Sequence, residues 1–400
     1  MSAGGGGAGG RFDAIVVGAG AAGAAAAYRL AKAGRRVALL EQFEVGHDRG
    51  SSHGASRIIR YTYEHPAYVQ LAREAYAAWE ELERETGTVL FHRTGDLFFG
   101  PAGGPIEVYF ETLRAEGIAH ERLAPADVER RFPAVRLPPD HVALHQPDGG
   151  LLEADECVLR HALRAEDLGA EVREDEPVRA IRTSGADPLV RVETDAGAYL
   201  TERLILTAGP WTARLTPDLR LPLRVTRQAV AYYGPKGDAS PFRADRLPVW
   251  VYVGWEGGRP GEDAIAYYGL PMFGRFGVKA ARHGTRNPAV DPDALDRTVR
   301  PGELDDVRAF LGRYFPGLAD AEAVDPHVCL YTVTPDEHFV IDVHPTDARI
   351  VLATACSGHG FKFASAIGRI LADLALTGRS TSPAFEAHRA MFSIGRFRVG

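Results

Sequence analysis

The chain has 400 residues, a formal net charge of −7, 45% hydrophobic and 25% charged residues, values typical of a globular protein with more than one domain. The charge argues against nucleic-acid binding, and without an apolar run of about 18 residues no membrane-spanning helix is expected. An odd, sparse set of cysteines argues against a disulfide framework and favours the cytoplasm: Cys157, Cys329 and Cys356. Residues 1–10 predict a flexible tail that lacks the features of a signal peptide.

Periodic apolar patterns alternate between strands and helices along the rest of the chain. Helices are predicted at 21–33, 68–86, 155–167, 303–314 and 363–376, and strands at 13–17, 37–40, 97–99, 178–183, 189–194, 198–206 and 349–353. The strand–helix–strand character appears at both ends and in the middle. We therefore expect an α/β fold with an α+β insert. A discontinuous Rossmann-type dinucleotide domain would comprise 11–92, 151–228 and 326–394, and a mostly antiparallel β domain 93–150 and 229–325.

A G-x-G-x-x-G motif, formed by Gly18, Gly20 and Gly23, lies between the first strand and the first helix. Such glycines permit a tight turn, let backbone approach a pyrophosphate and let the helix pack against the strand, with the phosphates at the helix N-terminus. Glu41 ends the second strand, about 20 residues on, where an acid binds a ribose. A chance glycine cluster does not explain this order of elements. The motif alone fits an NAD-dependent dehydrogenase as well as an FAD enzyme, and Gly209, after the strand at 198–206, adds only weak support.

Two further segments combine positive charge with glycine. Arg57 and Arg60 are three residues apart, so on one helical turn they would point the same way and hold a carboxylate or a flavin carbonyl. A solvated basic turn is the simpler interpretation of that segment alone. Gly358, Gly360 and Lys362 lie between a strand and a helix, where they would stabilise an anionic ligand. The alternative there is a capped helix with an exposed lysine.

Four other reactive residues are uninformative by themselves. Lys279 and His283 fit a surface charge and a core histidine, and Cys329 and Tyr331 share one face of a strand, where a cysteine is usually a small apolar group. No cluster of His, Cys and Asp has the spacing of a metal site, so no metal is expected.

Taken together, five segments resemble the monomeric sarcosine oxidase and N-methyltryptophan oxidase family, within the D-amino-acid-oxidase superfamily. They are FDAIVVGAGAAG, SSHGASRIIRYTY, YYGLPMFGRFGVKAARHG, VCLYTVTPDEHFVIDVHP and SGHGFKFASAIG, and the resemblance extends from about Phe12 to about Phe392. It implies FAD as the cofactor and a domain that binds substrate.

The resemblance assigns roles residue by residue. It implies a covalent bond from Cys329 to the flavin, oxygen activation by Lys279, and a substrate carboxylate held by Arg60 and Lys362. The remaining positions match residues beside the flavin or in the substrate pocket: His53, Arg57, Tyr268, His283 and Tyr331.

The implied reaction is oxidation of the C–N bond of a secondary amino acid, N-methyl or cyclic, to an imine, with oxygen reduced to hydrogen peroxide. The implied partners are this small substrate and oxygen, and the family suggests a monomer. Departures from the family pattern at Ser52, Ala55, Cys356 and 249–263 leave the substrate open. The alternatives are a specialised biosynthetic or sugar-derived amino acid as substrate, a dehydrogenase with another electron acceptor, and a non-catalytic flavin sensor.

Overall fold

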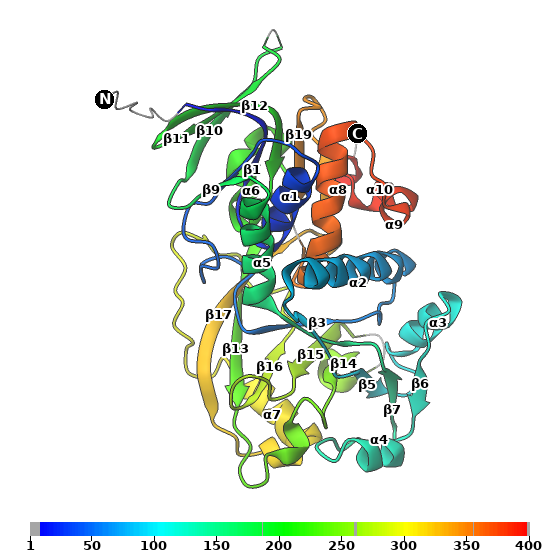
Figure 1. The fold of residues 1–400 in the computed structure, drawn as a ribbon. Helices are drawn as coiled ribbons and strands as arrows, with labels where there is room; N and C mark the ends of the chain where they lie inside the picture. The colour runs from blue at the N-terminus through cyan, green and yellow to red at the C-terminus, as the bar shows by residue number, and fades with distance from the viewer. Residues whose placement is uncertain (1–8, 186, 260–261, 355, 398–400) are drawn as a thin grey trace.

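The computed structural model describes residues 9–185, 187–259, 262–354 and 356–397. Two eight-stranded sheets, one above the other in Figure 1, and a small three-stranded sheet organise the chain. Most of the predicted 1–10 tail lies outside the described residues, as do residues 260 and 261 of the 249–263 stretch.

The first sheet is the predicted Rossmann-type unit. Its strands β9, β2, β1, β12 and β19 run parallel, while β10, β11 and β18 add antiparallel edges. The bounds are β1 (Arg11–Val17), β2 (Val37–Leu40), β9 (Glu171–Arg173), β10 (Val178–Arg182), β11 (Val190–Thr194), β12 (Gly197–Leu206), β18 (Val340–Val343) and β19 (Ile350–Thr354). Strand β2 is fully buried, β1 is buried over residues 14–17 and β12 over residues 204–206, which explains the apolar sequences of these stretches.

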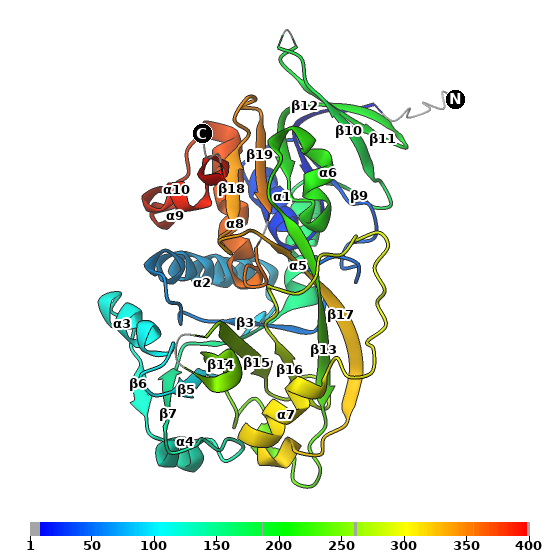
Figure 2. The same cartoon turned by 180° about the vertical axis from the view of Figure 1, so that it is seen from behind.

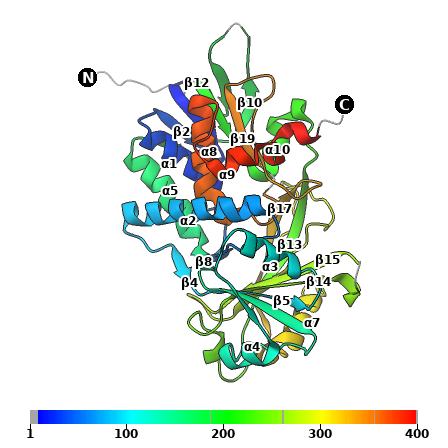
Figure 3. The ribbon, with the colours of Figure 1, turned by 90° about the vertical axis from the view of Figure 1, so that its right-hand side faces the viewer.

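Four helices pack with this sheet: α1 (Ala21–Lys32), α2 (Pro66–Thr86), α5 (Ala154–Asp167) and α8 (Ala364–Thr377). The predicted apolar face of α2 is confirmed, since Leu71, Ala75, Trp79 and Leu82 are all buried. In Figure 3 α2 crosses between the two halves of the molecule, with α8 above it. Short helices α6 (Thr212–Leu215), α9 (Pro383–Ala387) and α10 (Arg389–Phe392) complete this half, the last two beside β18 in Figure 2.

The second sheet has the order β17-β13-β16-β15-β14-β5-β7-β6 and is antiparallel except for the β14–β5 pair. Its strands are β5 (Asp96–Pro101), β6 (Glu121–Leu123), β7 (His141–Gln146), β13 (Arg224–Tyr233), β14 (Val249–Trp255), β15 (Ala264–Leu270), β16 (Val278–Arg282) and β17 (Ala323–Val333). Helix α7 (Asp305–Tyr314) covers its outer face through an apolar cluster that includes Phe99, Trp250 and Phe310, while α3 (Glu107–Ala115) and α4 (Pro125–Arg131) lie near β6 and β7. Strand β17 pairs with β13 along its length, so this sheet extends past the expected boundary at residue 325.

The expectation of a helical turn at Arg57 and Arg60 is wrong. Residues Ser56–Ile59 form strand β3, which pairs with β8 (Gly150–Glu153), and β8 also pairs with β4 (Phe91–Arg93). The β-branched pair Ile58 and Ile59 suits a strand better than a helix, and Arg60 follows directly after it. This small sheet joins the two large ones. Among the described residues, no helix is long and apolar enough to span a membrane.

Gly23 fixes the distance between α1 and the loop after β1. A Cβ at this position would collide with the carbonyl oxygen of Gly18 and the hydroxyl of Thr207. We expect Gly23→Ala to lower the free energy of unfolding by about 1–3 kcal/mol, as overpacking does, and to reduce flavin content. Urea denaturation and the flavin absorbance of the purified protein measure the two effects. Gly185→Ala, where no atom lies within 4 Å of the added Cβ, is the control; an equal loss in both variants would contradict the prediction.

Candidate active site

A single cavity of about 1880 Å³ extends from the glycine loop after β1 to the inner face of the second sheet. Except for Gly23, which packs behind the loop, all the predicted site residues line it. They come from both ends and the middle of the chain, and the two sheets bring them together. Small-molecule pockets usually occupy about 300–1,000 Å³, so this cavity has room for a dinucleotide and a second ligand.

At one end of the cavity, the first turn of α1 directs its backbone N–H groups toward the glycine loop and Ser52. Gly18 has φ +95°, which the tight turn requires and which side chains disfavour. The Ala21 N–H donates to the Ser52 hydroxyl at 3.1 Å, so Ser52, a departure from the family pattern, lies at the helix N-terminus. Gly209, at the end of β12, also has positive φ, +51°. These strand and helix ends form a cradle suited to a pyrophosphate.

Glu41 holds this cradle in shape. Its carboxylate accepts hydrogen bonds from the Ala19 N–H at 2.7 Å and the Phe43 N–H at 3.0 Å. The side chain is buried at the end of β2, directly beside the glycine loop. A ribose contact by Glu41 stays a prediction, but its position on the cradle is the one that such a contact needs.

Cys329 lies in the middle of the cavity, on β17, beside three positively charged or basic groups. Burial raises the pKa of its thiol, but the imidazoles of His327 and His53 and the charge of Arg57 outweigh this effect and bring the pKa well below its ordinary value. Tyr331 shares the face of Cys329, as predicted, and both line the cavity. A thiol with a lowered pKa is the reactive form of cysteine.

Lys279, on β16, is buried and points toward β3. Its ammonium donates to the backbone carbonyl of Ser56 at 2.9 Å. Burial and the nearby charge of Arg57 lower the pKa of Lys279 to about 7. Arg57 itself donates to the carbonyls of Ser56 and Ser51, and to that of His53.

A second pair of cations lies further toward the second sheet. Lys362 donates to the Tyr63 hydroxyl at 2.9 Å and to the His359 carbonyl at 2.6 Å. The Arg60 guanidinium stacks over the rings of Tyr63, at 4.3 Å, and Phe98, at 4.6 Å, and donates to the Thr62 carbonyl. Tyr63 thus connects Arg60 to Lys362. We call Arg60 and Lys362 the cation pair; its geometry suits a small carboxylate.

Three further side chains border the cation pair without carrying charge. Burial, with the charges of Arg60 and Lys362, lowers the pKa of His283 to about 4, so its imidazole is neutral at pH 7. His283 Nδ1 lies 3.4 Å from the Tyr331 hydroxyl. Burial raises the pKa of Tyr268 to about 12 and that of Tyr331 well above its ordinary value, so both phenols are protonated.

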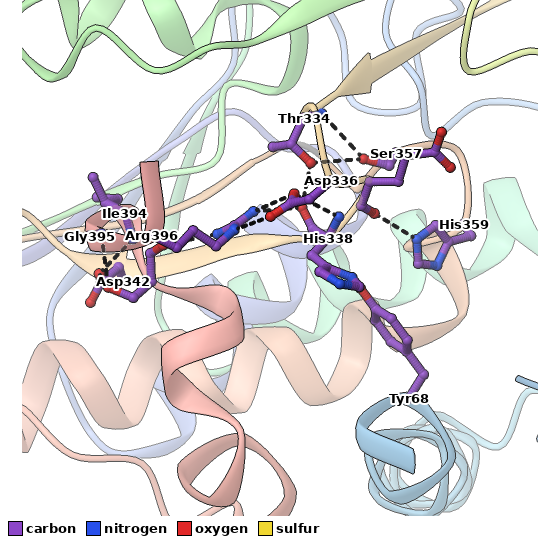
Figure 4. Close-up of polar contacts among 12 residues, drawn as sticks. Tyr68, Thr334, Asp336, His338, Asp342, Ser357, His359, Ile394, Gly395 and Arg396 are labelled. Carbon is purple, nitrogen blue, oxygen red and sulfur yellow. Dashed lines mark hydrogen bonds and ion pairs between the residues drawn. The ribbon is translucent and has the colours of Figure 1, made fainter. Parts of the chain in front are cut away.

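Polar contacts hold the loop after β17 against the segment that carries Lys362 (Figure 4). The Thr334 N–H donates to the Ser357 hydroxyl at 3.4 Å, and His359 Nε2 lies 3.2 Å from the Glu337 carbonyl. Arg396, near the C-terminus, forms an ion pair with Asp336 at 2.8 Å. The loop after β17 is therefore held both by the segment that carries Lys362 and by Arg396. These contacts fix the backbone next to Cys329 and Lys362.

Sequence reasoning missed four residues of this site. Tyr63 is three positions after Arg60 and lies beyond the end of β3, so only its place in the segment RIIRYTY gives a signal. His327 alternates with Cys329 on β17, so strand periodicity gives a signal for it. Ser52 and Asp96 had no such signal. Asp96 is fully buried near the cation pair, which only the packing of β5 reveals.

Comparisons with known proteins agree with this site. A model of the FAD dependent oxidoreductase (DAO) family matches residues 13–374. The chain is 37% identical over 393 residues to a monomeric sarcosine oxidase of Bacillus sp. (strain B-0618), covering 96% of each chain, and 38% identical over 397 residues to the peroxisomal sarcosine oxidase of Mus musculus, again covering 96% of each.

Solved structures show the same fold. The open form of NikD, an unusual amino acid oxidase essential for nikkomycin biosynthesis, is 26% identical with a TM-score of 0.78, covering 93% of this chain and 95% of NikD. L-proline dehydrogenase from P. horikoshii has a TM-score of 0.82 at 20% identity, covering 97% of this chain and 98% of that chain, which supports the fold alone. The family match, the sequence identity and the dinucleotide cradle together show that this chain belongs to the DAO family of FAD-dependent oxidoreductases.

Proposed function

We propose that this protein oxidises the C–N bond of a secondary amino acid, N-methyl or cyclic, to an imine, and that oxygen accepts the electrons. The observation that carries the proposal is the cation pair of Arg60 and Lys362, bridged by Tyr63, in the same cavity as Lys279 and the dinucleotide cradle. The names of the sarcosine oxidase relatives support the N-methyl class of substrate.

The residues present fit FAD. The glycine loop and the first turn of α1 would offer N–H groups to a pyrophosphate, and Glu41 beside this loop would contact a ribose. Cys329, which lines the same cavity and has a thiol with a lowered pKa, would attach the flavin. FAD, when bound, accepts a hydride from the carbon next to the amine nitrogen and returns the electrons to oxygen, which leaves as hydrogen peroxide. Arg57 and Lys279 would supply positive charge that stabilises a reduced, anionic cofactor.

The chain's own residues bind and orient the amino acid. Arg60 and Lys362 hold its carboxylate through charge-assisted hydrogen bonds, while the aromatic rings of Tyr63 and Phe98 fix the guanidinium plane. His283 is neutral, so it adds no positive charge beside the amine of the substrate. Tyr268 and Tyr331 border the same space with protonated hydroxyls. Positioning of this kind contributes much of the rate in such a reaction.

A specialised substrate remains the second candidate within this reaction class, and the β14–β15 hairpin favours it. Val251 and Val253 line the cavity, and the turn of the hairpin forms ion pairs with β16 and the segment after it, Glu256 with Arg282 at 2.6 Å and Asp263 with Arg286. The hairpin therefore forms the wall of the cavity on this side, and its side chains would select the substrate.

We also propose a cytoplasmic monomer. The described cysteines, Cys157, Cys329 and Cys356, are all free thiols, which suits a reducing compartment. The name of the bacterial relatives, monomeric sarcosine oxidase, supports the monomer.

Anaerobic flavin absorbance during titration with sarcosine, N-methyltryptophan, pipecolate, proline and a fructosyl amino acid tests the reaction class. We expect at least one secondary amino acid to bleach the flavin, and oxygen to restore the colour with release of peroxide. Restored colour only with an artificial acceptor would replace the oxidase by a dehydrogenase. Bleaching by none of the five would contradict the proposal for simple amino acids and favour a larger substrate or a flavin sensor.

Covalent attachment through Cys329 makes a direct prediction. After acid denaturation of the wild-type protein, the yellow colour should stay with the polypeptide, and Cys329→Ser should release essentially all flavin into the supernatant. Cys157→Ala, a buried thiol on α5 outside the cavity, is the matched control and should keep its flavin. Free flavin from the wild-type protein would rule out the bond.

Lys279 should act on oxygen rather than on the amino acid. The ammonium form of Lys279 predominates below its pKa, which burial lowers to about 7, so flavin reoxidation should slow as pH rises through the pKa of this residue. Lys279→Met should slow reoxidation by about 100-fold or more, as loss of one preorganised charge does, and remove the pH dependence. Stopped-flow absorbance separates the two half-reactions, with the exposed Lys236→Met as control. Equal slowing of reduction and reoxidation would contradict this role.

A further inference from the structure

Asp96 is a fully buried carboxylate on an inner strand, where such a group has no evident structural use. It begins β5, which pairs with β7 at Gln146 and with β14 at Val249. The exposed fraction of Asp96 is 0%, and neither carboxylate oxygen has a hydrogen-bond partner among the described residues. The Thr62 hydroxyl is also buried; it faces the carboxyl and, through its O–H, lowers the pKa of Asp96. An unpaired buried charge is costly, so it calls for an explanation.

The packing of β5 directs Asp96 toward the cation pair. Side chains two residues apart share a face of a strand, so Asp96 and Phe98 point the same way. The Phe98 ring lies 4.6 Å from the guanidinium carbon of Arg60. The charges of Arg60 and Lys362 both act on the Asp96 carboxyl, and that of Asp96 acts on Lys362.

We propose that Asp96 is a positioning residue whose negative charge keeps the Lys362 ammonium protonated before the substrate carboxylate arrives. The inference rests on the proposed function, because it takes the cation pair to be the carboxylate site. Asp96 lies behind that pair and does not contact the substrate. It therefore acts on binding through Lys362.

The charges around Lys362 explain why it needs such a partner. Burial and the neighbouring Arg60 bring the pKa of Lys362 well below its ordinary value, while Asp96 raises it. Burial raises the pKa of Asp96 to about 7, and Arg60, Thr62 and Lys362 oppose that shift. Without Asp96, a buried lysine beside an arginine loses its proton at lower pH and can no longer bind an anion as a cation.

The other ionisable groups that face Lys362 and Asp96 do not account for a change in carboxylate binding near pH 7 to 9. The groups that face Lys362 are Arg57, Arg60, Tyr63, Cys356, His283 and His359. Burial lowers the pKa of His283 to about 4 and that of His359 well below its ordinary value, and it raises the pKa of Cys356 to about 12 and that of Tyr63 above its ordinary range. Tyr76 faces Asp96 from α2, and burial raises its pKa well above the ordinary value too.

Lys279 titrates in the same range, and it shares the charge of Arg57 with Lys362, but the charge of Asp96 does not act on it. The charges that act on it are those of Arg57, Cys329, Asp155 and Arg275. A substitution at Asp96 should therefore leave the titration of Lys279 in place, so a change in the pH dependence of anion binding can be assigned to Lys362.

The test uses acetate as a carboxylate probe on the flavin-loaded protein. Its Kd is measured from the flavin absorbance change between about pH 6 and about pH 10, a range that spans the shifted lysine values. In the wild type we expect a constant Kd from above the pKa of Asp96, about 7, up to the pH at which Lys362 loses its proton, and then a rise of about tenfold per pH unit. In Asp96→Asn this break should move to lower pH by about one unit or more.

Asp148→Asn is the matched control, because Asp148 is a nearby carboxylate that pairs with Arg93 outside the cavity. It should keep the wild-type break. If Asp96→Asn does not fold, Asp96→Val, which suits a strand, carries the same expectation. A break that stays in place in the Asp96 variant, or moves to higher pH, would overturn the inference even if the variant binds acetate more weakly, since a purely structural role changes affinity and stability alone.

Lys362→Met separates this inference from the proposed function. If acetate binding is lost in Lys362→Met but the break is unchanged in Asp96→Asn, only the role of Asp96 is wrong. If Lys362→Met binds acetate as tightly as the wild type, the cation pair is not the carboxylate site, and both proposals are overturned.

Discussion

Four buried or partly buried cations meet in one cavity, and the way they are held determines what the cavity can bind. Each donates to backbone carbonyls: Lys279 to Ser56, Lys362 to His359, Arg60 to Thr62, and Arg57 to Ser51, Ser56 and His53. A carbonyl orients a cation and satisfies a hydrogen bond without cancelling the charge, whereas an ion pair with a carboxylate would neutralise it. The positive charge therefore remains available to an anionic ligand.

This arrangement depends on loops whose backbone is fixed from both sheets. The carbonyls that hold Arg57 and Lys279 belong to the loop before β3 and to β3 itself, which β8 anchors. The carbonyl that holds Lys362 belongs to the loop that Glu337 contacts across the cavity. A Cβ on Gly358 would collide with the ring of Tyr331, so this glycine lets the C-terminal loop pack on β17. The positions of the charged groups thus depend on the packing of three segments: the loop before β3 with β3 itself, β17, and the loop that contains Gly358 and His359.

The sequence predicted the dinucleotide unit well because its signals are local. Apolar runs, glycine spacing and the acid Glu41 all lie within one strand–helix–strand unit, and the structure confirms β1, α1 and β2. Arg57 and Arg60 show the opposite case. A three-residue spacing favours one face of a helix, but pairing with β8 made the segment a strand, and that partner is almost a hundred residues away. Both residues nevertheless line the cavity. Arg57 lies on the strand, and Arg60 lies just past its end.

Asp96 was beyond prediction for a related reason. On the sequence it is an acid before an apolar strand, which is an ordinary strand boundary. Its burial arises from β7 and β14 on either side, and its influence on Lys362 arises from a loop near the other end of the chain. The two residues that the proposal links, Lys362 and Asp96, therefore come from the C-terminal loop and from β5. Val251 and Val253 on β14 line the same cavity, and β14 pairs with β5 at Asp96 and Phe98, so the substrate wall and the charged groups are packed against each other.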